Sequence, residues 1–220
     1  MARPNRKLGY AAAALLMVAA GSSPRLSNAV AADAASEPHT EGEASAAPDH
    51  RPSAVDLRRA FQKWGLDTRH QGSRGTCSAF VVAAAIEYAV ATHEREAVRL
   101  SVEFLNWASN QTTKTPQDGG FFSDLWNGCA QFGICPDVDM PYLDRSEPAV
   151  QPREQALAHA KRIKYLGLQM HWIKEWNPHR GLTDGQLAGI KRTLQQRWPV
   201  CGGFLWPKQP RWENGVLQMC

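Results

Sequence analysis

The stretch QGSRGTCSAF, residues 71–80, places a thiol where a glycine-rich turn meets an apolar run. Cys77 stands at the predicted start of a helix, whose unpaired N–H groups and dipole favour the nucleophilic thiolate. Gly72 and Gly75 allow a sharp turn, which would bring the amide of Gln71 back toward Cys77. The Gln71 side chain and the Cys77 backbone N–H would then point to one spot, as in an oxyanion hole for acyl transfer. This stretch alone leaves open the alternative of a buried structural cysteine at a helix start.

The number of cysteines is odd, which makes one thiol stand out. The sequence holds Cys77, Cys129, Cys135, Cys201 and Cys220. In an oxidising compartment, an odd thiol is either free and reactive or paired with another chain. Cys129 and Cys135 lack the close C-x-x-C spacing that is typical of zinc sites, so we predict no metal and no other cofactor.

The net charge of +4 does not indicate a nucleic-acid partner. The first 31 residues contain Arg3, Arg6, Lys7 and Arg25 and no acidic residue, and the remaining 21 basic residues balance 21 acidic ones. A neutral domain offers no electrostatic surface for a polyanion.

The N-terminus has the order of an export signal: a basic start, an apolar run at 8–20 and small residues before a cleavage site after Ala29 or Ala31. The run is shorter than the roughly 20 residues of a membrane span. We therefore expect residues 1–31 to be a signal peptide and the mature protein to be periplasmic or extracellular, without a membrane span. An uncleaved anchor or a disordered Ala-rich tail is the alternative. Residues 32–50 are poor in large apolar side chains and are predicted to be a disordered linker.

Beyond the linker, the sequence predicts an α+β fold. The run 77–91 is apolar on nearly every face, which indicates a helix at the centre of a domain. Further helices are predicted at 100–110 after a Ser101 N-cap, at 121–132 before Gly133, at 153–162, and after a Thr183 cap up to 197. Strands are predicted at 164–173 and 199–206. Helices thus precede strands, which is typical of α+β proteins.

The segment 71–80 resembles the Gln-Gly-x-x-Gly-x-Cys-x-Ala-Phe segment of papain-like cysteine peptidases. Other pieces resemble this family in the same order along the chain: PSAVDLR at 52–58, LSVEFLNW at 100–107, the segment 118–142 with its Gly-Gly pair and Gly-Ile-Cys-Pro stretch, and IKRTLQQRWPVCGGF at 190–204. The resemblance implies a papain-like fold, with a helical left domain at 51–150 that carries the nucleophile. A β-rich right domain would be only partly present at 151–220.

The resemblance also implies roles for single residues. Cys77 matches the nucleophile, Gln71 the oxyanion-hole glutamine, and Gly119 and Gly120 the pair whose backbone receives an extended peptide substrate. Glycine lets a peptide approach the backbone closely, although a Gly-Gly pair standing alone indicates only a flexible turn.

The sequence also departs from the family pattern at several positions. Arg74 stands where many members have a disulfide-bonded cysteine, Ser78 where a tryptophan usually follows the nucleophile, and Asp118 where asparagine is usual.

The largest departure concerns the general base. In the family, a histidine about 130–150 residues beyond the cysteine acts as the base, and an asparagine orients it. No histidine lies between residues 180 and 220, and His70, His171 and His179 occupy positions without a matching role. We therefore expect a cysteine peptidase that acts on a peptide or protein through a thioester on Cys77, in a truncated form with impaired activity.

Two alternatives remain open at this point. One is a catalytically inactive peptide-binding module that keeps the groove, and the other is an unrelated secreted helical protein with a structural Cys77. Endopeptidase and exopeptidase action, side-chain specificity and the oligomeric state do not follow from the sequence.

Overall fold

The structure is a computed structural model that describes residues 15–20, 54–147, 150–164, 166–175, 177, 180–203, 211–213 and 216–218. Its elements in chain order are β1 (Leu15–Ala20), α1 (Arg58–Lys63), α2 (Cys77–Glu94), α3 (Val102–Thr113), α4 (Phe122–Phe132), the short 3-10 helix η1 (Asp137–Asp139), α5 (Glu154–Lys164), β2 (Leu168–Lys174), α6 (Asp184–Gln195), β3 (Arg211–Glu213) and β4 (Val216–Gln218). The predicted linker at 32–50 lies outside the described residues.

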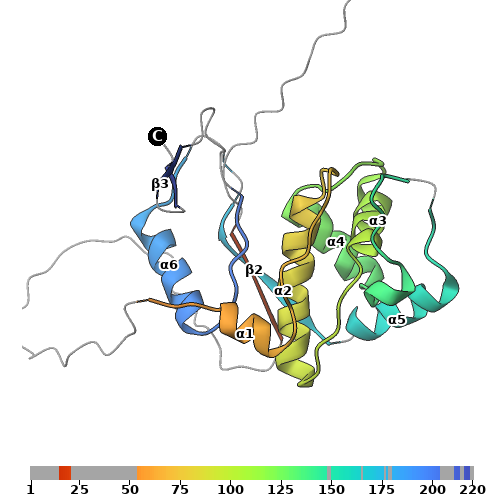
Figure 1. The fold of residues 1–220 in the computed structure, drawn as a ribbon, viewed down its shortest axis with the longest axis horizontal. Helices are drawn as coiled ribbons and strands as arrows, with labels where there is room; N and C mark the ends of the chain where they lie inside the picture. Colours follow the sequence, from red (N-terminus) through yellow and green to blue (C-terminus); the bar gives the residue numbers. More distant parts are fainter. Residues whose placement is uncertain are drawn as a thin grey trace, which may run out of the picture.

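Helix α2 is the centre of the molecule. Figure 1 shows it between α3, α4 and α5 on one side and β2 and α6 on the other. Its small and branched side chains, such as Ala83, Ile86 and Ala89, are fully buried and form the main core with α3 and α4. Leu168 and Met170 of β2 pack against this core from the other side. The predicted all-round apolar helix is therefore confirmed, and its position follows from its composition.

Three of the predicted helices, α3, α4 and α6, begin and end close to the predicted residues. Ser101 caps α3 by accepting a hydrogen bond of 2.9 Å from the Phe104 N–H. Gly133 follows the last residue of α4 with a φ of 83°, in the left-handed region that favours glycine. Thr183 caps α6 in a reciprocal capping box with Gln186.

Helix α5 packs on the first group of helices. Ala156 and Ala160 lie in a second core with Phe104 and Ala108 of α3 and with Cys135. The predicted boundary between residues 150 and 151 assigned this helix to the second domain. The domain boundary stays a prediction, but α5 contacts α4, and its buried alanines pack with residues of α3 and of the loop after α4.

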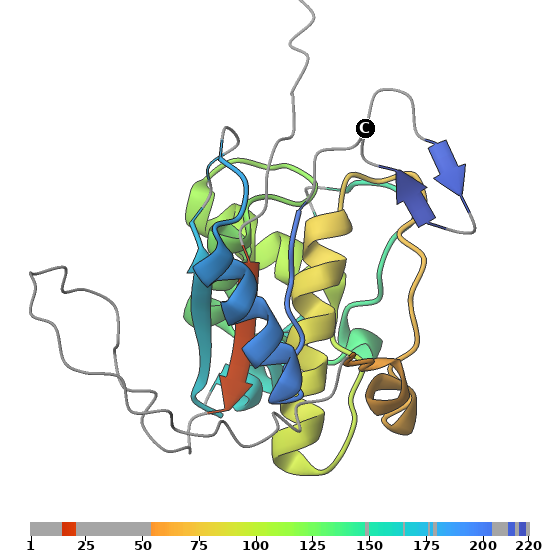
Figure 2. The same cartoon turned by 90° about the vertical axis from the view of Figure 1, so that its left-hand side faces the viewer.

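The strands form two small antiparallel sheets. β1 pairs with β2, and β3 pairs with β4; Figure 2 shows the first pair beside α6. Residues 15–20, which were predicted as part of the apolar run of an export signal, form β1 in this structure of the whole chain. Export itself stays a prediction.

One predicted strand is absent where the structure describes it. Residues 199–203 contain a single bridge residue, Cys201, instead of a strand, and residues 204–206 of the same prediction lie outside the described residues. Pro199 lacks a backbone donor, and Gly202 and Gly203 have no side chain to pack, which disfavours a regular ladder.

We predict that Gly128→Ala strongly destabilises the protein. A Cβ at Gly128 on α4 would lie 2.5 Å from the Ser109 backbone nitrogen of α3, and backbone atoms cannot move aside as a flexible side chain does. We expect the free energy of unfolding to fall by about 3 kcal/mol in chemical denaturation.

The matched control is Gly185→Ala near the start of α6, where the added Cβ meets only the Thr183 hydroxyl at 4.0 Å. This change should leave the stability equal or raise it by up to about 1 kcal/mol, because alanine is the better helix former. Equal effects of the two substitutions would contradict the close crossing of α3 and α4.

Candidate active site

The candidate nucleophile lies at an uncapped helix start. Cys77 is the first residue of α2, and its side chain is exposed. The preceding residue, Thr76, is fully buried and does not cap the helix with its side chain. Its hydroxyl lies 2.6 Å from the Tyr142 hydroxyl instead. The first-turn N–H groups of α2 therefore receive no side-chain cap, an arrangement that suits a negative charge next to the helix.

The other described cysteines differ from Cys77 in their surroundings. Cys129, Cys135 and Cys201 are free and buried. Burial raises the pKa of each of these three thiols to about 12. The thiolate is the reactive form, and a raised pKa keeps these three thiols protonated. Cys77 is the exposed thiol among the described cysteines. The structure gives no disulfide between Cys77 and another described cysteine, and the assignment of Cys77 as the odd thiol stays a prediction.

Gln71 lies on the same turn, but its amide has a partner of its own. Its Nε2 donates a hydrogen bond of 2.8 Å to the Arg74 carbonyl oxygen. The Tyr142 hydroxyl donates to the Gln71 carbonyl oxygen at 2.9 Å, so the Thr76 hydroxyl must be the donor toward Tyr142. A side-chain amide has two N–H groups, and the predicted oxyanion role would use the second one. The structure gives no hydrogen bond between Gln71 and Cys77.

The Gly119–Gly120 pair packs directly against residues 71–78, which we call the nucleophile turn after the candidate nucleophile Cys77. Gly119 has a φ of 69°, and a Cβ there would lie 2.6 Å from the Gly75 carbonyl oxygen. The Gly120 N–H donates to the Ser78 hydroxyl at 3.1 Å. Glycine is required at 119 both by its conformation and by this close approach. Three of the predicted site residues, Cys77, Gly119 and Gly120, are thus brought to one region with Gln71 beside them.

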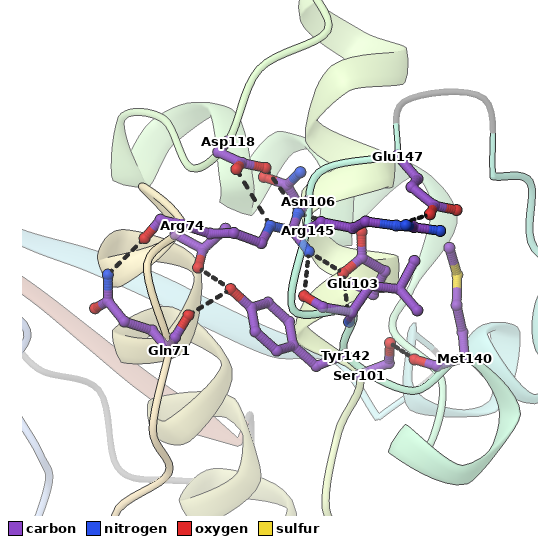
Figure 3. Close-up of polar contacts among 12 residues, drawn as sticks. Gln71, Arg74, Ser101, Glu103, Asn106, Asp118, Met140, Tyr142, Arg145 and Glu147 are labelled. Atoms are coloured by element: carbon purple, nitrogen blue, oxygen red, sulfur yellow. Dashed lines mark hydrogen bonds and ion pairs between the residues drawn. The ribbon is translucent and has the colours of Figure 1, made fainter.

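Arg74 is the charged centre of this region, as Figure 3 shows. Its guanidinium is buried and pairs with Glu103 of α3 at 2.6 Å and with Asp118 at 2.7 Å. It also donates to the Leu143 carbonyl oxygen and lies 4.8 Å from the centre of the Tyr142 ring. Burial alone would lower the pKa of Arg74, but its hydrogen bonds to Asp118 and Glu103 outweigh this and raise it. The guanidinium is therefore firmly charged.

The sequence analysis singled out Arg74 and Asp118 only as departures from the family and did not identify their partners. Glu103, Asn106 and Asn110 of α3 follow one another at intervals of three and four residues and lie on one helix face. Asn106 accepts the Gly119 N–H at 2.8 Å and, with Asn110, donates to the Gln117 carbonyl oxygen. This spacing of polar residues along one face of α3 is a sequence signal that the face binds a neighbouring loop.

A second buried acid contacts the segment that leads into the turn. Glu87 of α2 is fully buried and accepts the Leu100 N–H at 2.7 Å. Burial raises the pKa of this carboxyl group, while Arg69, the Leu100 N–H and Arg99 oppose the rise. Arg69 lies 2.9 Å from it and immediately precedes the segment that enters the turn. A single acid inside an apolar run signals such a buried partner.

The histidines do not complete the site among the described residues. His70 is exposed, and its Nδ1 accepts the Gly72 N–H at 3.0 Å. His93 pairs with Glu94, and His159 pairs with Asp139 at 2.7 Å. His171 is exposed on β2, and His179 lies outside the described residues. No described histidine forms a hydrogen bond with Cys77.

Other kinds of site find little support in the described part of the chain. A cavity of about 250 Å³ lies beside α3, and its lining includes Glu103 and Lys114 but not Cys77. Within the described residues, no three His, Cys, Asp or Glu side chains are grouped to hold a metal ion. None of the described helices combines the length and apolar character that a membrane span requires.

Comparisons with known proteins identify the family. The family model described as papain family cysteine protease matches residues 51–184, which is more than half of the chain. The chain therefore belongs to the papain family. Its fold class is the predicted papain-like α+β fold, and the described residues hold its helical part and few strands.

Two solved structures are similar to the chain over part of its length. Xylellain, a cysteine protease from Xylella fastidiosa, is 22% identical with a TM-score of 0.42, over 49% of this chain and 44% of that one. Digestive procathepsin L 3 from the larval midgut of Tenebrio molitor is 18% identical with a TM-score of 0.38, over 51% of this chain and 35% of that one. The chain thus spans less than half the length of each. No curated protein matches it.

We predict that alkylation separates Cys77 from the buried thiols. With iodoacetamide at mildly alkaline pH, the native protein should be modified at Cys77 well before Cys129, Cys135 and Cys201. Their pKa values of about 12 and their burial keep them protonated and covered. Peptide mapping by mass spectrometry after short labelling times gives the rates.

The unfolded protein is the control, because all four thiols should react at similar rates in denaturant. Native labelling of Cys129 or Cys201 at the rate of Cys77 would contradict the assignment of Cys77 as the accessible thiol.

Proposed function

We propose that this chain carries the nucleophile, the oxyanion donors and the substrate-binding edge of a cysteine peptidase. In this proposal the Cys77 thiolate attacks the carbonyl carbon of a peptide bond and forms a thioester, while the amine leaves with a proton from the general acid. Water then cleaves the thioester and restores the thiol. The substrate is a peptide or protein in extended form.

The observation that carries the proposal is the contact between the nucleophile turn and the Gly119–Gly120 segment. An exposed thiol at an uncapped helix start lies on the same turn that packs against a glycine backbone. An extended peptide beside Gly119 and Gly120 would present its carbonyl to Cys77 by main-chain hydrogen bonds. The developing oxyanion would accept hydrogen bonds from the Cys77 backbone N–H and from the second N–H of the Gln71 side chain.

The proposed reaction also needs a general base, and none of the described histidines forms a hydrogen bond with Cys77. Without an imidazole, nothing holds the thiolate–imidazolium pair, and nothing protonates the leaving amine. We therefore propose that the 220 residues by themselves hydrolyse peptides poorly. The second candidate function is a peptide-binding module, which the packed Gly119–Gly120 edge would serve without any base.

We predict that a peptidyl vinyl sulfone labels Cys77, whereas the same chain turns over a fluorogenic peptide amide at most weakly. Loss of a general acid–base group typically costs about 10²–10⁴-fold, and here the group would also activate the nucleophile. The measurements are intact-mass analysis of the labelled protein and fluorescence of the peptide substrate.

Cys77→Ala is the control, and it should abolish labelling while leaving peptide binding intact. Strong turnover that depends on Cys77 and is lost in His70→Ala would show that His70 is the base, which contradicts this part of the proposal. Binding of peptide without any labelling of Cys77 would favour the binding module.

We further propose that the protein is exported to the periplasm or beyond, with residues 1–31 as the signal. Removal of this segment would also remove β1, the partner of β2 in the whole chain. The mature protein is expected to begin at Val30 or Ala32, as N-terminal sequencing of secreted material would show. An intact Met1 on the secreted protein would contradict this prediction.

A further inference from the structure

Arg74 satisfies every donor of its guanidinium within the protein. Nε and one Nη2 N–H bind the two oxygens of Asp118, at 3.2 and 2.7 Å. The remaining N–H groups reach Glu103 at 2.6 and 3.3 Å and the Leu143 carbonyl oxygen at 2.8 Å. An arginine side chain has five N–H donors in a planar arrangement, so all of them have acceptors. Such a complete set fixes the orientation of the group as well as its position.

The four segments that meet at Arg74 are far apart in the sequence. Arg74 belongs to the nucleophile turn, Glu103 to α3, Asp118 to the loop before α4, and Leu143 to the segment after η1. The Glu103 carboxylate also accepts the Leu143 N–H at 3.2 Å, so the carboxylate and the guanidinium bind the same segment. Figure 3 shows the side chains of Glu103 and Asp118 pointing toward the Arg74 guanidinium.

Asp118 connects Arg74 to the proposed substrate-binding edge, Gly119–Gly120, because it directly precedes Gly119 in the chain. On the two sides of Asp118, Asn106 of α3 binds the Gln117 carbonyl oxygen and the Gly119 N–H, at 3.1 and 2.8 Å. The Gly120 N–H reaches across to the Ser78 hydroxyl, next to Cys77, at 3.1 Å. The Asp118 carboxylate adds two charged hydrogen bonds to Arg74 in the nucleophile turn. The spacing between the nucleophile turn and the Gly119–Gly120 backbone therefore depends on the Arg74–Asp118 pair as well as on the Gly120–Ser78 hydrogen bond.

We propose that Arg74 is a positioning residue that holds the nucleophile turn in register with the Gly119–Gly120 edge. This inference rests on the proposed function, since it assigns a purpose to the edge, but its structural part is independent of catalysis. The link is a pair of charged groups, so reducing agents leave it intact. Its strength depends on burial and on the two-pronged contact between guanidinium and carboxylate.

The test uses the full chain with Asp118→Ala, which removes the link to the edge but keeps the buried Arg74–Glu103 pair. Hydrogen–deuterium exchange, followed by mass spectrometry, should show about tenfold faster exchange of the Gly119 and Gly120 amides. The interior amides of α2 and α4 should keep their rates. If the Asp118 side chain only stabilised the fold, its removal would raise exchange in all these segments together.

Labelling of Cys77 gives a second readout, which separates position from reactivity. Iodoacetamide needs only the thiol, whereas a peptidyl vinyl sulfone also needs the edge. Asp118→Ala should slow labelling by the peptidyl probe about tenfold and change the iodoacetamide rate less than about twofold, since a small misplacement of a bound substrate is costly. A wild-type protein without preference for the peptidyl probe would refute the proposed function but leave the exchange test of Arg74 valid.

Matched variants complete the design. Glu147→Ala removes a carboxylate from an exposed pair with Arg145 and should change neither readout. Asp118→Asn keeps an acceptor without the charge and should give an intermediate effect, and it replaces Asp118→Ala if that variant does not fold. Arg74→Lys keeps the charge but loses the two-pronged contact, so it should resemble Asp118→Ala at Gly119 and Gly120. Unchanged exchange at these amides in Asp118→Ala, or an equal rise throughout α2 and α4, would overturn the proposal.

Discussion

The buried guanidinium of Arg74 imposes the strictest condition on this structure. A charged group removed from water is tolerated only when its partners satisfy it completely, and Arg74 finds five acceptors on Glu103, Asp118 and Leu143. These acceptors belong to three segments, which Asn106 of α3 and the Leu143 N–H also connect to one another. The loop before α4 and the segment after η1 must therefore close around the nucleophile turn for the charge to be buried at all.

The turn that carries Cys77 is held from both sides by acid–arginine contacts. Glu87, inside the central helix α2, binds Arg69 ahead of the turn, and Glu103 binds Arg74 within it. Between these points, the Gln71 amide and the Tyr142 hydroxyl bond to backbone carbonyl oxygens of the same turn. The thiol is thus presented by a rigid segment although it is exposed. Preorganised donors are effective because they need no rearrangement when charge develops.

The sequence predicted what local chemistry determines. The helix at Cys77, the Ser101 and Thr183 caps and the Gly133 stop were readable because each depends on neighbouring residues. The contacts of Arg74 were not readable, since its partners stand 29 and 44 positions away and come together only through the packing of α3 and the next loop. The β3–β4 pair was missed although Asn214 and Gly215, a strong hairpin signal, stand between its strands. The strand expected at 199–206 failed over its described part because apolar character outweighed Pro199 and the two glycines in that prediction.

Positioning and proton transfer are separable tasks in acyl transfer, and under the proposed function the described residues supply the first. Residues 71–143 contain the Cys77 thiol, the Gln71 amide, the Gly119–Gly120 edge and the Arg74–Asp118 pair. All of these contacts are made within the helical part and require no histidine. Under the proposed function, the base therefore approaches a site that is already formed, and the peptide must fit an edge whose spacing from the nucleophile turn depends on the Arg74–Asp118 pair. The geometry of substrate binding then follows from a buried ion pair, while the rate of the chemical step depends on a group that the ion pair does not position.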